Sequence, residues 1–438
     1  MVTSKNSSDL LLLTFWSVCL VFSGPHSFGT ASPLEDPKEK AVAKVKALGG
    51  TLSFDEETEG KPLVSITLAN SLVSDDDLED FRDLTTLQAL DLCDTPITDK
   101  GIMKLKDLTR LQRFDLSGTL VTDEGLEALQ DMAYLQSLRL NNTMITGDGL
   151  KHLTKLGKLK RLSIESRSLT DDGMKQVAKL VHLNDLSLNG TLINDLDLGR
   201  LEELGELEVL DLGCTDITDI GLDSIKGLTN LKEVRLHSCR DMTDDGLKCL
   251  KTLAKLEKLD LSSTSVSDKG VEHLSGLASL ACLDLSETEV IGTSINGLKK
   301  LRELNLFGSK LTDEGMQSIK GLTDLEALDL ALTQVTDKGI QELKGLKNLY
   351  RLGLCHTSVG DLGLAFIKGL SKLRQLDLRD TKLTDKGLET LQGMKSLQEL
   401  DLQQNEITNA ATSKLKKALP ELKELEGRFT GWLRPKLV

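Results

Sequence analysis

The sequence predicts an α/β solenoid, a curved stack of about fifteen short coils that share one core. The first observation is that residues 87–101 return, slightly altered, about every 24 residues almost to the end of the 438-residue chain. The second is an alternating Leu-x-Leu triplet in each copy, which predicts a short strand. The third is a Thr-Asp pair followed by leucines at helical spacing, which predicts a helix. Repeats of this length bury their apolar faces only against neighbouring copies.

Fifteen copies can be counted by the central apolar residue of each predicted strand. Neighbouring copies are 24 residues apart nearly everywhere. The spacing is 25 from Val234 to Leu259, and it is 21 from Leu283 to Leu304, where the Thr-Asp-x-Gly-Leu segment is missing. The fifteen central residues are Ile66, Leu90, Phe114, Leu138, Leu162, Leu186, Leu210, Val234, Leu259, Leu283, Leu304, Leu328, Leu352, Leu376 and Leu400.

Within each coil, the leucines of the strand are expected to point inward and the residues between them outward. A Thr, Asn or Cys after the strand turns the chain, and its side chain can bond buried backbone groups. Thr98 and Asp99 then supply a helix cap and a negative charge at the helix start, and the glycine that follows is expected to be a helix-start residue. Helices are about 10 Å across and strands under about 5 Å apart, so the stack must curve with the sheet inside.

The strand pattern, L-x-x-L-x-L-x-x-(N/C/T)-x-(I/L/V) over residues 63–409, resembles the leucine-rich repeat. The Ile-Thr-Asp-x-Gly-Leu segment after it resembles the cysteine-containing subclass found in F-box proteins and in many secreted bacterial repeat proteins. The resemblance implies a horseshoe with a parallel concave sheet, helices on the convex side and a protein-binding role. The position that turns the chain after each strand, called the ladder position, is usually Cys in that subclass. In this chain it is mostly Thr, and the exceptions are Arg167, Cys239, Ser309 and Asn405. It is Thr in ten coils, at Thr95, Thr119, Thr143, Thr191, Thr215, Thr264, Thr288, Thr333, Thr357 and Thr381.

Residues 1–31 predict a secretory signal peptide. Lys5 precedes an apolar run of 13 residues at positions 10–22, and small residues follow at positions 29–31. The run is shorter than the roughly 20 residues that a bilayer requires, so we expect no stable membrane insertion. A short buried or interfacial helix is the alternative interpretation.

Three regions are expected after the signal peptide. Residues 32–62 are predicted to form a linker and a helix-plus-strand cap, because the open edge of the first coil must be covered. Residues 63–409 hold the repeats. Residues 410–438 are predicted to form a C-terminal cap and tail, in which Trp432 covers the final leucines.

The composition disfavours several classes of function. The net charge of −14 disfavours binding to nucleic acids, which need a basic protein face, and to anionic membrane surfaces. The seven cysteines contain no Cys-x-x-Cys pair, so we predict no metal site, no disulfide framework and no cofactor. No Gly-x-Ser-x-Gly, phosphate-loop or His-Glu-x-x-His motif is present.

An acidic ladder is predicted on the concave face, where the outward residue of eight strands is Asp. We interpret it as a stripe that favours partners with a basic surface. Two alternatives are a weak cation site and a carboxylate pair such as Asp260 and Asp284, whose separation would be near that of a retaining glycosidase. The ladder consists of Asp91, Asp115, Asp211, Asp260, Asp284, Asp329, Asp377 and Asp401.

A different group of outward residues is apolar and predicts the partner site. Basic residues flank its apolar members, as they do in interface hot spots. The short coil at residues 290–300 lies beside this group. Scattered surface apolarity is the alternative. The apolar members are Phe307, Ala327, Ala331, Leu332 and Cys355, and the flanking members are Arg351, His356 and Arg379.

We therefore predict a protein-interaction scaffold, not an enzyme, that binds a partner through its concave face. It is expected to be monomeric and secreted or periplasmic. The alternative is a cytoplasmic adaptor resembling the substrate receptors of ubiquitin ligases, although no F-box-like helical segment precedes the repeats. A minor alternative is a carbohydrate-active enzyme that uses the acidic ladder. N-terminal sequencing separates the first two, since a start near Ser32 indicates export and an intact Met1 indicates the adaptor.

Overall fold

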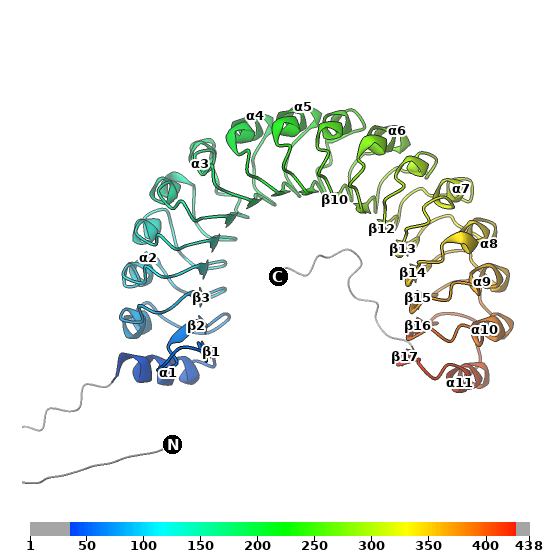
Figure 1. Cartoon of the computed structure of the whole chain (residues 1–438), viewed down its shortest axis with the longest axis horizontal. Coiled ribbons are helices and arrows are strands. Elements are labelled where there is room, and N and C mark those ends of the chain that lie inside the picture. The colour runs from blue at the N-terminus through cyan, green and yellow to red at the C-terminus, as the bar shows by residue number, and fades with distance from the viewer. Residues whose placement is uncertain (1–35, 426–438) are drawn as a thin grey trace, which may run out of the picture. The chain divides into compact units, whose positions relative to one another are not determined.

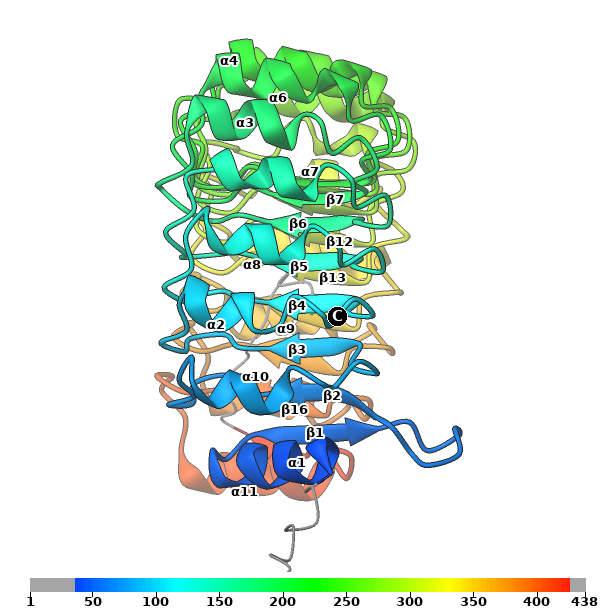
Figure 2. The same cartoon turned by 90° about the vertical axis from the view of Figure 1, so that its left-hand side faces the viewer.

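The computed structural model describes residues 36–425, and residues 37–425 belong to one compact unit. Within this unit the strands line the inside of an arc and the helices lie on its outside (Figure 1). The side view shows the coils stacked as successive layers (Figure 2). The predicted α/β solenoid with a concave sheet and convex helices is therefore confirmed. Residues 1–31 and Trp432, for which a signal peptide and a covering role are predicted, lie outside the described residues.

The described strands form one 17-stranded sheet in which each strand pairs with the next along the chain. All of these pairs are parallel except β1 with β2, which is antiparallel. The strands are β1 Thr51–Phe54, β2 Leu63–Thr67, β3 Ala89–Asp91, β4 Arg113–Asp115, β5 Ser137–Arg139, β6 Arg161–Ser163, β7 Asp185–Ser187, β8 Val209–Asp211, β9 Glu233–Arg235, β10 Lys258–Asp260, β11 Cys282–Asp284, β12 Glu303–Asn305, β13 Ala327–Asp329, β14 Arg351–Gly353, β15 Gln375–Asp377, β16 Glu399–Asp401 and β17 Glu424–Leu425.

The convex side carries short helices, many of which are 3-10 turns where the sequence predicts α-helix. A 3-10 turn rises about 2.0 Å per residue against about 1.5 Å for an α-helix, so it crosses the width of a coil with fewer residues. The α-helices are α1 Pro37–Ala47, α2 Asp99–Met103, α3 Asp171–Val177, α4 Asp195–Leu198, α5 Asp219–Leu222, α6 Asp268–Glu272, α7 Met316–Ile319, α8 Asp337–Ile340, α9 Asp361–Ile367, α10 Asp385–Leu391 and α11 Asn409–Ala418. The 3-10 helices are η1 Asp77–Phe81, η2 Gly125–Leu129, η3 Asp148–Leu153, η4 Gly199–Glu203, η5 Asp223–Gly227, η6 Gly246–Thr252, η7 His273–Gly276, η8 Ile295–Gly297 and η9 Gln341–Gly345.

One continuous apolar core runs through the stack. In the coil of β3, the strand leucines Leu90 and Leu92 and the helix-side leucines Leu105 and Leu108 are at most 1% exposed. The central residues of neighbouring strands lie beside each other in the sheet register, as Leu90 and Phe114 do in β3 and β4. Each coil therefore buries its leucines against the coils on either side, as the repeat predicts.

The ladder threonines close the turn after each strand. The hydroxyl of the buried Thr95 donates to the carbonyl of Leu92 at 2.6 Å, and the same bond recurs in the other threonine coils. At two ladder positions that do not hold Thr, the side chain also bonds the preceding coil. The Cys239 thiol donates to the Leu212 carbonyl at 3.2 Å, and the Asn405 amide donates to the Leu378 carbonyl at 2.6 Å.

The Thr-Asp pair connects coils as well as starting helices. The Thr98 hydroxyl accepts from the backbone of Lys100, which is the predicted cap. The Asp99 carboxylate, however, reaches the next coil, where it accepts from the backbone N–H and the hydroxyl of Thr122, both at 2.8 Å. The same arrangement joins Asp75 to Thr98, Asp123 to Thr146, Asp195 to Thr218, Asp219 to Thr243, Asp244 to Ser267, Asp313 to Thr336, Asp361 to Thr384 and Asp385 to Thr408.

These carboxylates explain the glycine of the Thr-Asp-x-Gly segment better than the helix start does. A Cβ at Gly387 would lie 2.4 Å from the Asp361 carboxylate. The prediction of a helix-start glycine is therefore incomplete, because the residue is small to leave room for the carboxylate of the preceding coil.

The short coil replaces the missing segment with one tight turn. The Asp268 carboxylate accepts from the backbone N–H of Ile291 at 2.7 Å and of Ser294 at 3.0 Å, which anchors the turn before η8. The next coil then packs directly on it, since a Cβ at Gly315 would lie 1.9 Å from the Ile291 carbonyl oxygen. This contact holds the coil of β12 against the short coil.

A helix and a strand lie against each end of the described repeats. At the first coil, β1 pairs with β2, and Ala41 and Val45 of α1 are fully buried. At the last coil, α11 buries Leu415 and β17 pairs with β16.

Candidate partner-binding surface

The predicted partner residues lie together on the concave side of β12, β13, β14 and the turns that follow these strands and β15. Strand pairing places Ala327 beside Arg351. It also places Asp329 between Asn305 and Gly353, which hold the same position in the neighbouring strands. The eight predicted residues together make up the Leu332 surface, and they are Phe307, Ala327, Ala331, Leu332, Arg351, Cys355, His356 and Arg379.

Leu332 is the most unusual member of this surface. It is 48% exposed, and its backbone has a positive φ of 56°. For a residue other than Gly, Asn or Asp, the left-handed conformation costs roughly 1–2 kcal/mol. In other described coils the same turn position also has positive φ and holds small or polar residues, namely Asn70, Asp94, Gly118, Asn142, Gly190, Cys214, Ser238, Ser263, Glu287, Gly308, His356, Asp380 and Gln404. The backbone conformation belongs to the fold, since the Leu332 N–H donates to the Cys355 carbonyl at 2.9 Å and the same bond recurs in other coils. The exposed leucine side chain is the unusual feature, and it points to a use outside the fold.

The apolar part of the surface is smaller than the sequence predicts. Ala327, Ala331 and Cys355 are at most 5% exposed, and Phe307 is half-buried. Alternation along a strand predicts that these residues face the concave side, but alanine and cysteine are too short to project beyond larger neighbours on strands about 4.8 Å apart. They therefore add little exposed apolar area beside Leu332.

The basic residues at the rim are tied to the sheet. Arg379 lies 3.7 Å from the Asp377 carboxylate and donates to the Cys355 sulfur at 3.6 Å, and Arg351 bonds Gln375. The Arg379 Nε is buried without a hydrogen-bond partner, whereas the side chain as a whole is partly exposed. Burial raises the pKa of the Cys355 thiol to about 11, which keeps it protonated and unreactive.

His356 pairs with Asp380 across neighbouring turns. Its Nδ1 lies 2.6 Å from the Asp380 carboxylate, and the ring is exposed. This pair extends the Leu332 surface toward β16 with a group that can carry charge.

Every member of the acidic ladder has a structural role. Each carboxylate accepts from the backbone N–H two residues on, at 2.9–3.0 Å, and so holds the turn after its strand. Asn305 does the same for Phe307 at 3.0 Å, so the position requires an acceptor and not a charge. Strand pairing brings together Asp91 with Asp115, Asp260 with Asp284, and Asp377 with Asp401, but it separates Asp211 and Asp329 from the other members.

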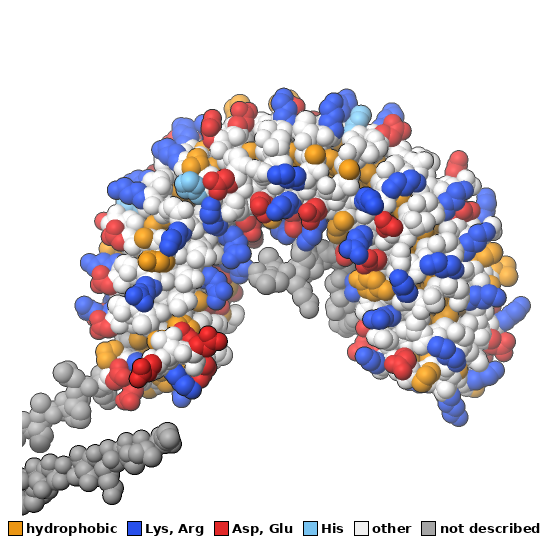
Figure 3. Space-filling model, in the orientation of Figure 1, with side chains coloured by type: hydrophobic (Ala, Val, Ile, Leu, Met, Phe, Trp, Pro, Cys, Tyr) orange, Lys and Arg blue, Asp and Glu red, His pale blue; other side chains and the backbone are white. Residues whose placement is uncertain are grey.

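The ladder is also less uniformly acidic than the sequence suggests. Burial is the main cause that raises the pKa of Asp91, Asp284 and Asp377, and it raises the pKa of Asp329 to about 7. Basic and acidic side chains both line the inner rim in the space-filling view (Figure 3). Attraction of a basic partner by the ladder stays a prediction.

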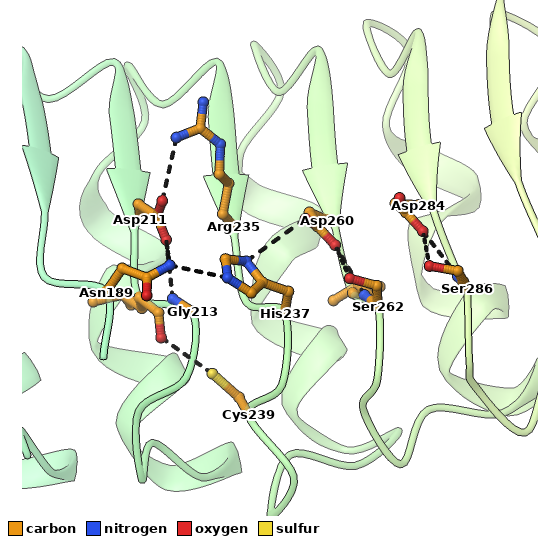
Figure 4. Close-up of polar contacts among 12 residues, drawn as sticks. Asn189, Asp211, Gly213, Arg235, His237, Cys239, Asp260, Ser262, Asp284 and Ser286 are labelled. Carbon is orange, nitrogen blue, oxygen red and sulfur yellow. Dashed lines mark hydrogen bonds and ion pairs between the residues drawn. The ribbon is translucent and has the colours of Figure 1, made fainter. Parts of the chain in front are cut away.

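The middle of the concave face holds a polar network (Figure 4). His237 Nε2 lies 2.9 Å from the Asn189 amide, and Arg235 donates to the Asp211 carboxylate at 3.2 Å. The His237 ring lies over Gly213, where a Cβ would meet the ring at 2.1 Å. Sequence analysis missed this network, although a glycine at an outward turn position one coil before a histidine is a usable signal.

The alternative glycosidase pair is part of the same face (Figure 4). Asp260 and Asp284 pair across β10 and β11, and each carboxylate accepts from a serine hydroxyl at 2.6 Å as well as from a backbone N–H. Asp284 also accepts from the Asn305 amide at 2.9 Å. These bonds give both carboxylates a structural role.

Two sequence families match the chain. A family model described as a leucine-rich repeat region matches residues 162–434, which is more than half of the chain. A second model, described as a leucine rich repeat, matches residues 83–106 and 108–129. The chain belongs to the leucine-rich repeat family. Among curated proteins compared with it, none matches.

Solved leucine-rich repeat structures share the fold at low sequence identity. An internalin from Listeria monocytogenes has 22% identity and a TM-score of 0.57, over 77% of this chain and 93% of that one. A leucine-rich repeat protein from Leptospira interrogans has 23% identity and a TM-score of 0.56, over 80% and 86%. The mouse RP105/MD-1 complex has 19% identity and a TM-score of 0.55, over 78% and 71%.

Two further findings concern the described part of this leucine-rich repeat protein. Between residues 36 and 425, no group of three or more His, Cys, Asp or Glu residues is arranged to hold a metal ion. No helix in that same range combines the length and the hydrophobicity of a membrane span.

Proposed function

We propose that this leucine-rich repeat protein is a non-catalytic, monomeric scaffold that binds a partner protein through the Leu332 surface. The observation that carries the proposal is an exposed leucine, Leu332, at a turn position that holds Gly, Cys or polar residues in the other coils with positive φ, because burial in the core does not explain a large apolar side chain there. The low-identity neighbour titled as the RP105/MD-1 complex is consistent with a binding role for such a scaffold.

The surface defines the chemistry of the partner. Leu332 and the half-buried Phe307 suit an apolar side chain. The partly exposed guanidinium of Arg379 suits an acceptor such as a backbone carbonyl. Exposed acidic groups nearby, such as Asp380, suit basic residues at the edge of the partner.

Replacing Leu332 by Asn tests the proposal. Asn tolerates positive φ, as Asn70 and Asn142 show at the same turn position, so unfolding should become less favourable by about 1 kcal/mol. Affinity for the partner should fall about tenfold or more, because the apolar anchor is lost.

The measurement is affinity capture on the immobilised chain, followed by a dissociation constant for the purified partner. Asp94→Asn is the matched control, since Asp94 occupies the same turn position near the other end of the sheet and also has positive φ. Equal affinity of Leu332→Asn and wild type would rule out the Leu332 surface.

We also propose export to the periplasm or the exterior, on the signal-like composition of residues 1–31. Sequencing the N-terminus of the native protein tests this, and an intact Met1 would favour the cytoplasmic adaptor instead. Assignment to the cysteine-containing subclass is a further proposal, supported by the Cys239 thiol that occupies one ladder position and bonds the preceding coil.

A further inference from the structure

The exposed residues of the parallel strands are all basic. In β2 to β16, every strand residue is buried or half-buried except four. Three of the four lie in the consecutive strands β4, β5 and β6, and basic side chains are visible along the inner edge of this arm of the arc (Figure 3). These three make up the Arg139 cluster, which consists of Arg113, Arg139 and Arg161, and the fourth exposed residue is Lys258 of β10.

The three arginines surround one serine. Strand pairing places Ser137 between Arg113 and Arg161, which are therefore two strand spacings, or about 9.6 Å, apart. Arg139 lies two residues further along the strand of Ser137, on the same face and about 6.6 Å away. Within residues 36–425 the Ser137 hydroxyl has no hydrogen-bond partner. The long side chains of the cluster can therefore bring three guanidinium groups and a hydroxyl to one incoming group.

Two of the three arginines have no carboxylate partner. Arg139 lies 3.4 Å from the Asp115 carboxylate. In the described part of the chain, no carboxylate oxygen lies within 4.0 Å of the guanidinium of Arg113 or Arg161. The half-buried Arg235 of β9, by contrast, pairs with two carboxylates. Ion pairing within the sheet therefore leaves two guanidinium groups of the cluster open to an external acid.

The strands of the cluster are locally basic in an acidic protein. Residues 112–118, 136–142 and 160–166, which contain β4, β5 and β6 with their turns, carry four basic and two acidic side chains, a net charge of +2. None of these six is buried, and the three cluster arginines are the exposed ones. Asp91 and Asp185 border the cluster in β3 and β7, but both are half-buried. Charge complementarity therefore favours an acidic ligand. The six side chains are Arg113, Asp115, Arg139, Lys160, Arg161 and Glu165.

The shape and composition of the face favour a protein as the source of the acid. The strands line the inside of the arc (Figure 1), where a flat membrane surface cannot lie against them. Single-stranded nucleic acids stack on exposed aromatic residues, and Phe114, the one aromatic residue of these three segments, is buried. Exposed ion pairs to a small anion contribute little, whereas a protein excludes water from the arginines that it covers.

We propose that the Arg139 cluster binds an acidic patch, formed by two or more Asp or Glu side chains, on a protein partner. Planar guanidinium groups bind carboxylates through two parallel N–H donors, which Arg113 and Arg161 can supply. The cluster is centred eight strands before β13, so it is a second contact site on the concave face, separate from the Leu332 surface. It rests on the proposed function only in that the ligand is a protein. A partner that reaches both sites is thereby held in one orientation.

An octaglutamate peptide tests the cluster without the natural partner. Its fluorescence anisotropy, titrated with the full-length chain at low ionic strength, gives a dissociation constant. Arg113→Gln and Arg161→Gln should each weaken binding about threefold or more, and together about tenfold, because each removes a guanidinium that has no partner in the fold. Lys258→Gln is the matched control, since it removes one exposed strand charge outside the cluster, and it should leave the affinity nearly unchanged.

Several results would overturn the proposal. These are no binding of the peptide, equal affinity of the wild type and the arginine variants, and an equal loss in Lys258→Gln, which would show only general attraction. A heparin octasaccharide and an eight-nucleotide DNA strand are titrated in parallel. Binding of either that depends on the arginines, when binding of the peptide does not, would assign the cluster to a glycan or a nucleic acid instead. Unchanged circular dichroism of each variant confirms that folding is intact.

The captured partner separates this inference from the proposed function. Its association rate constant should fall about fivefold or more in the double variant Arg113→Gln with Arg161→Gln, and the rate should depend less on salt. Loss of binding in Leu332→Asn, with peptide and partner binding independent of the arginines, would keep the function and reject the inference. Loss in the arginine variants, with partner affinity unchanged in Leu332→Asn, would keep the cluster and reject the Leu332 surface.

Discussion

Asp329→Asn is expected to stabilise the fold above pH 7 and to leave it nearly unchanged below pH 4. Burial raises the pKa of Asp329 from an ordinary value of 3.8 to about 7 in the folded chain. The folded state therefore holds the proton more tightly than the unfolded state, and stability falls as pH rises from about 4 to about 7. Each pKa unit corresponds to about 1.4 kcal/mol, so Asn should add about 2–4 kcal/mol at pH 8.

The neighbouring coil shows that Asn preserves the structural role of Asp329. Asn305 occupies the equivalent position, is 6% exposed and accepts from the backbone N–H of Phe307. Asn305→Asp is the reciprocal control, because it places a third carboxyl between Asp284 and Asp329 and should destabilise the chain at pH 8. Melting temperatures at pH 4 and pH 8 check both variants, and a change independent of pH would contradict the burial of an ionising carboxyl at this position.

Gly315→Ala is expected to destabilise the chain by about 3 kcal/mol or more. The added Cβ would lie 1.9 Å from the Ile291 carbonyl oxygen and 3.0 Å from the Gly292 Cα. Both are backbone atoms, so no side-chain rotation relieves the contact. The short coil cannot move away either, because Asp268 holds Ile291 and Ser294 through their N–H groups.

Gly276→Ala is the matched control for this substitution. Gly276 ends η7 in the coil that precedes the short coil, and a Cβ there would meet nothing within 4 Å. Thermal unfolding of the two variants should therefore differ clearly, with Gly276→Ala near wild type. Similar melting temperatures for both would contradict the close packing of the short coil.

The core could be predicted from the sequence because its cause is periodic. Leu90 and Leu92 recur with the repeat, and any coil that exposes them to water is unfavourable, so spacing alone assigns them to the interior. The contact between Asp99 and Thr122 could not be predicted in this way. Both residues satisfy the rules for a helix start, and only the stacking of coils shows that the carboxylate bonds the next turn.

The sequence predicts which residues make up the candidate site, but it does not predict how exposed each of them is. Alternation places Ala331 and Cys355 on the concave side, but how far a short side chain projects depends on the curvature and on its neighbours. Leu332 was a candidate for its apolarity, whereas its strain appears only in the backbone φ. The signal was present in the sequence, because Asn, Asp, Gly or Ser occupies this turn position in most other coils.

Hydrogen exchange of the complex with the captured partner tests the central claim most directly. The claim predicts slower exchange in peptides that contain residues 303–310, 327–334 and 351–358, with the convex helices unchanged. Protection confined to the convex helices, with these three segments exchanging as in the free chain, would contradict binding at the Leu332 surface.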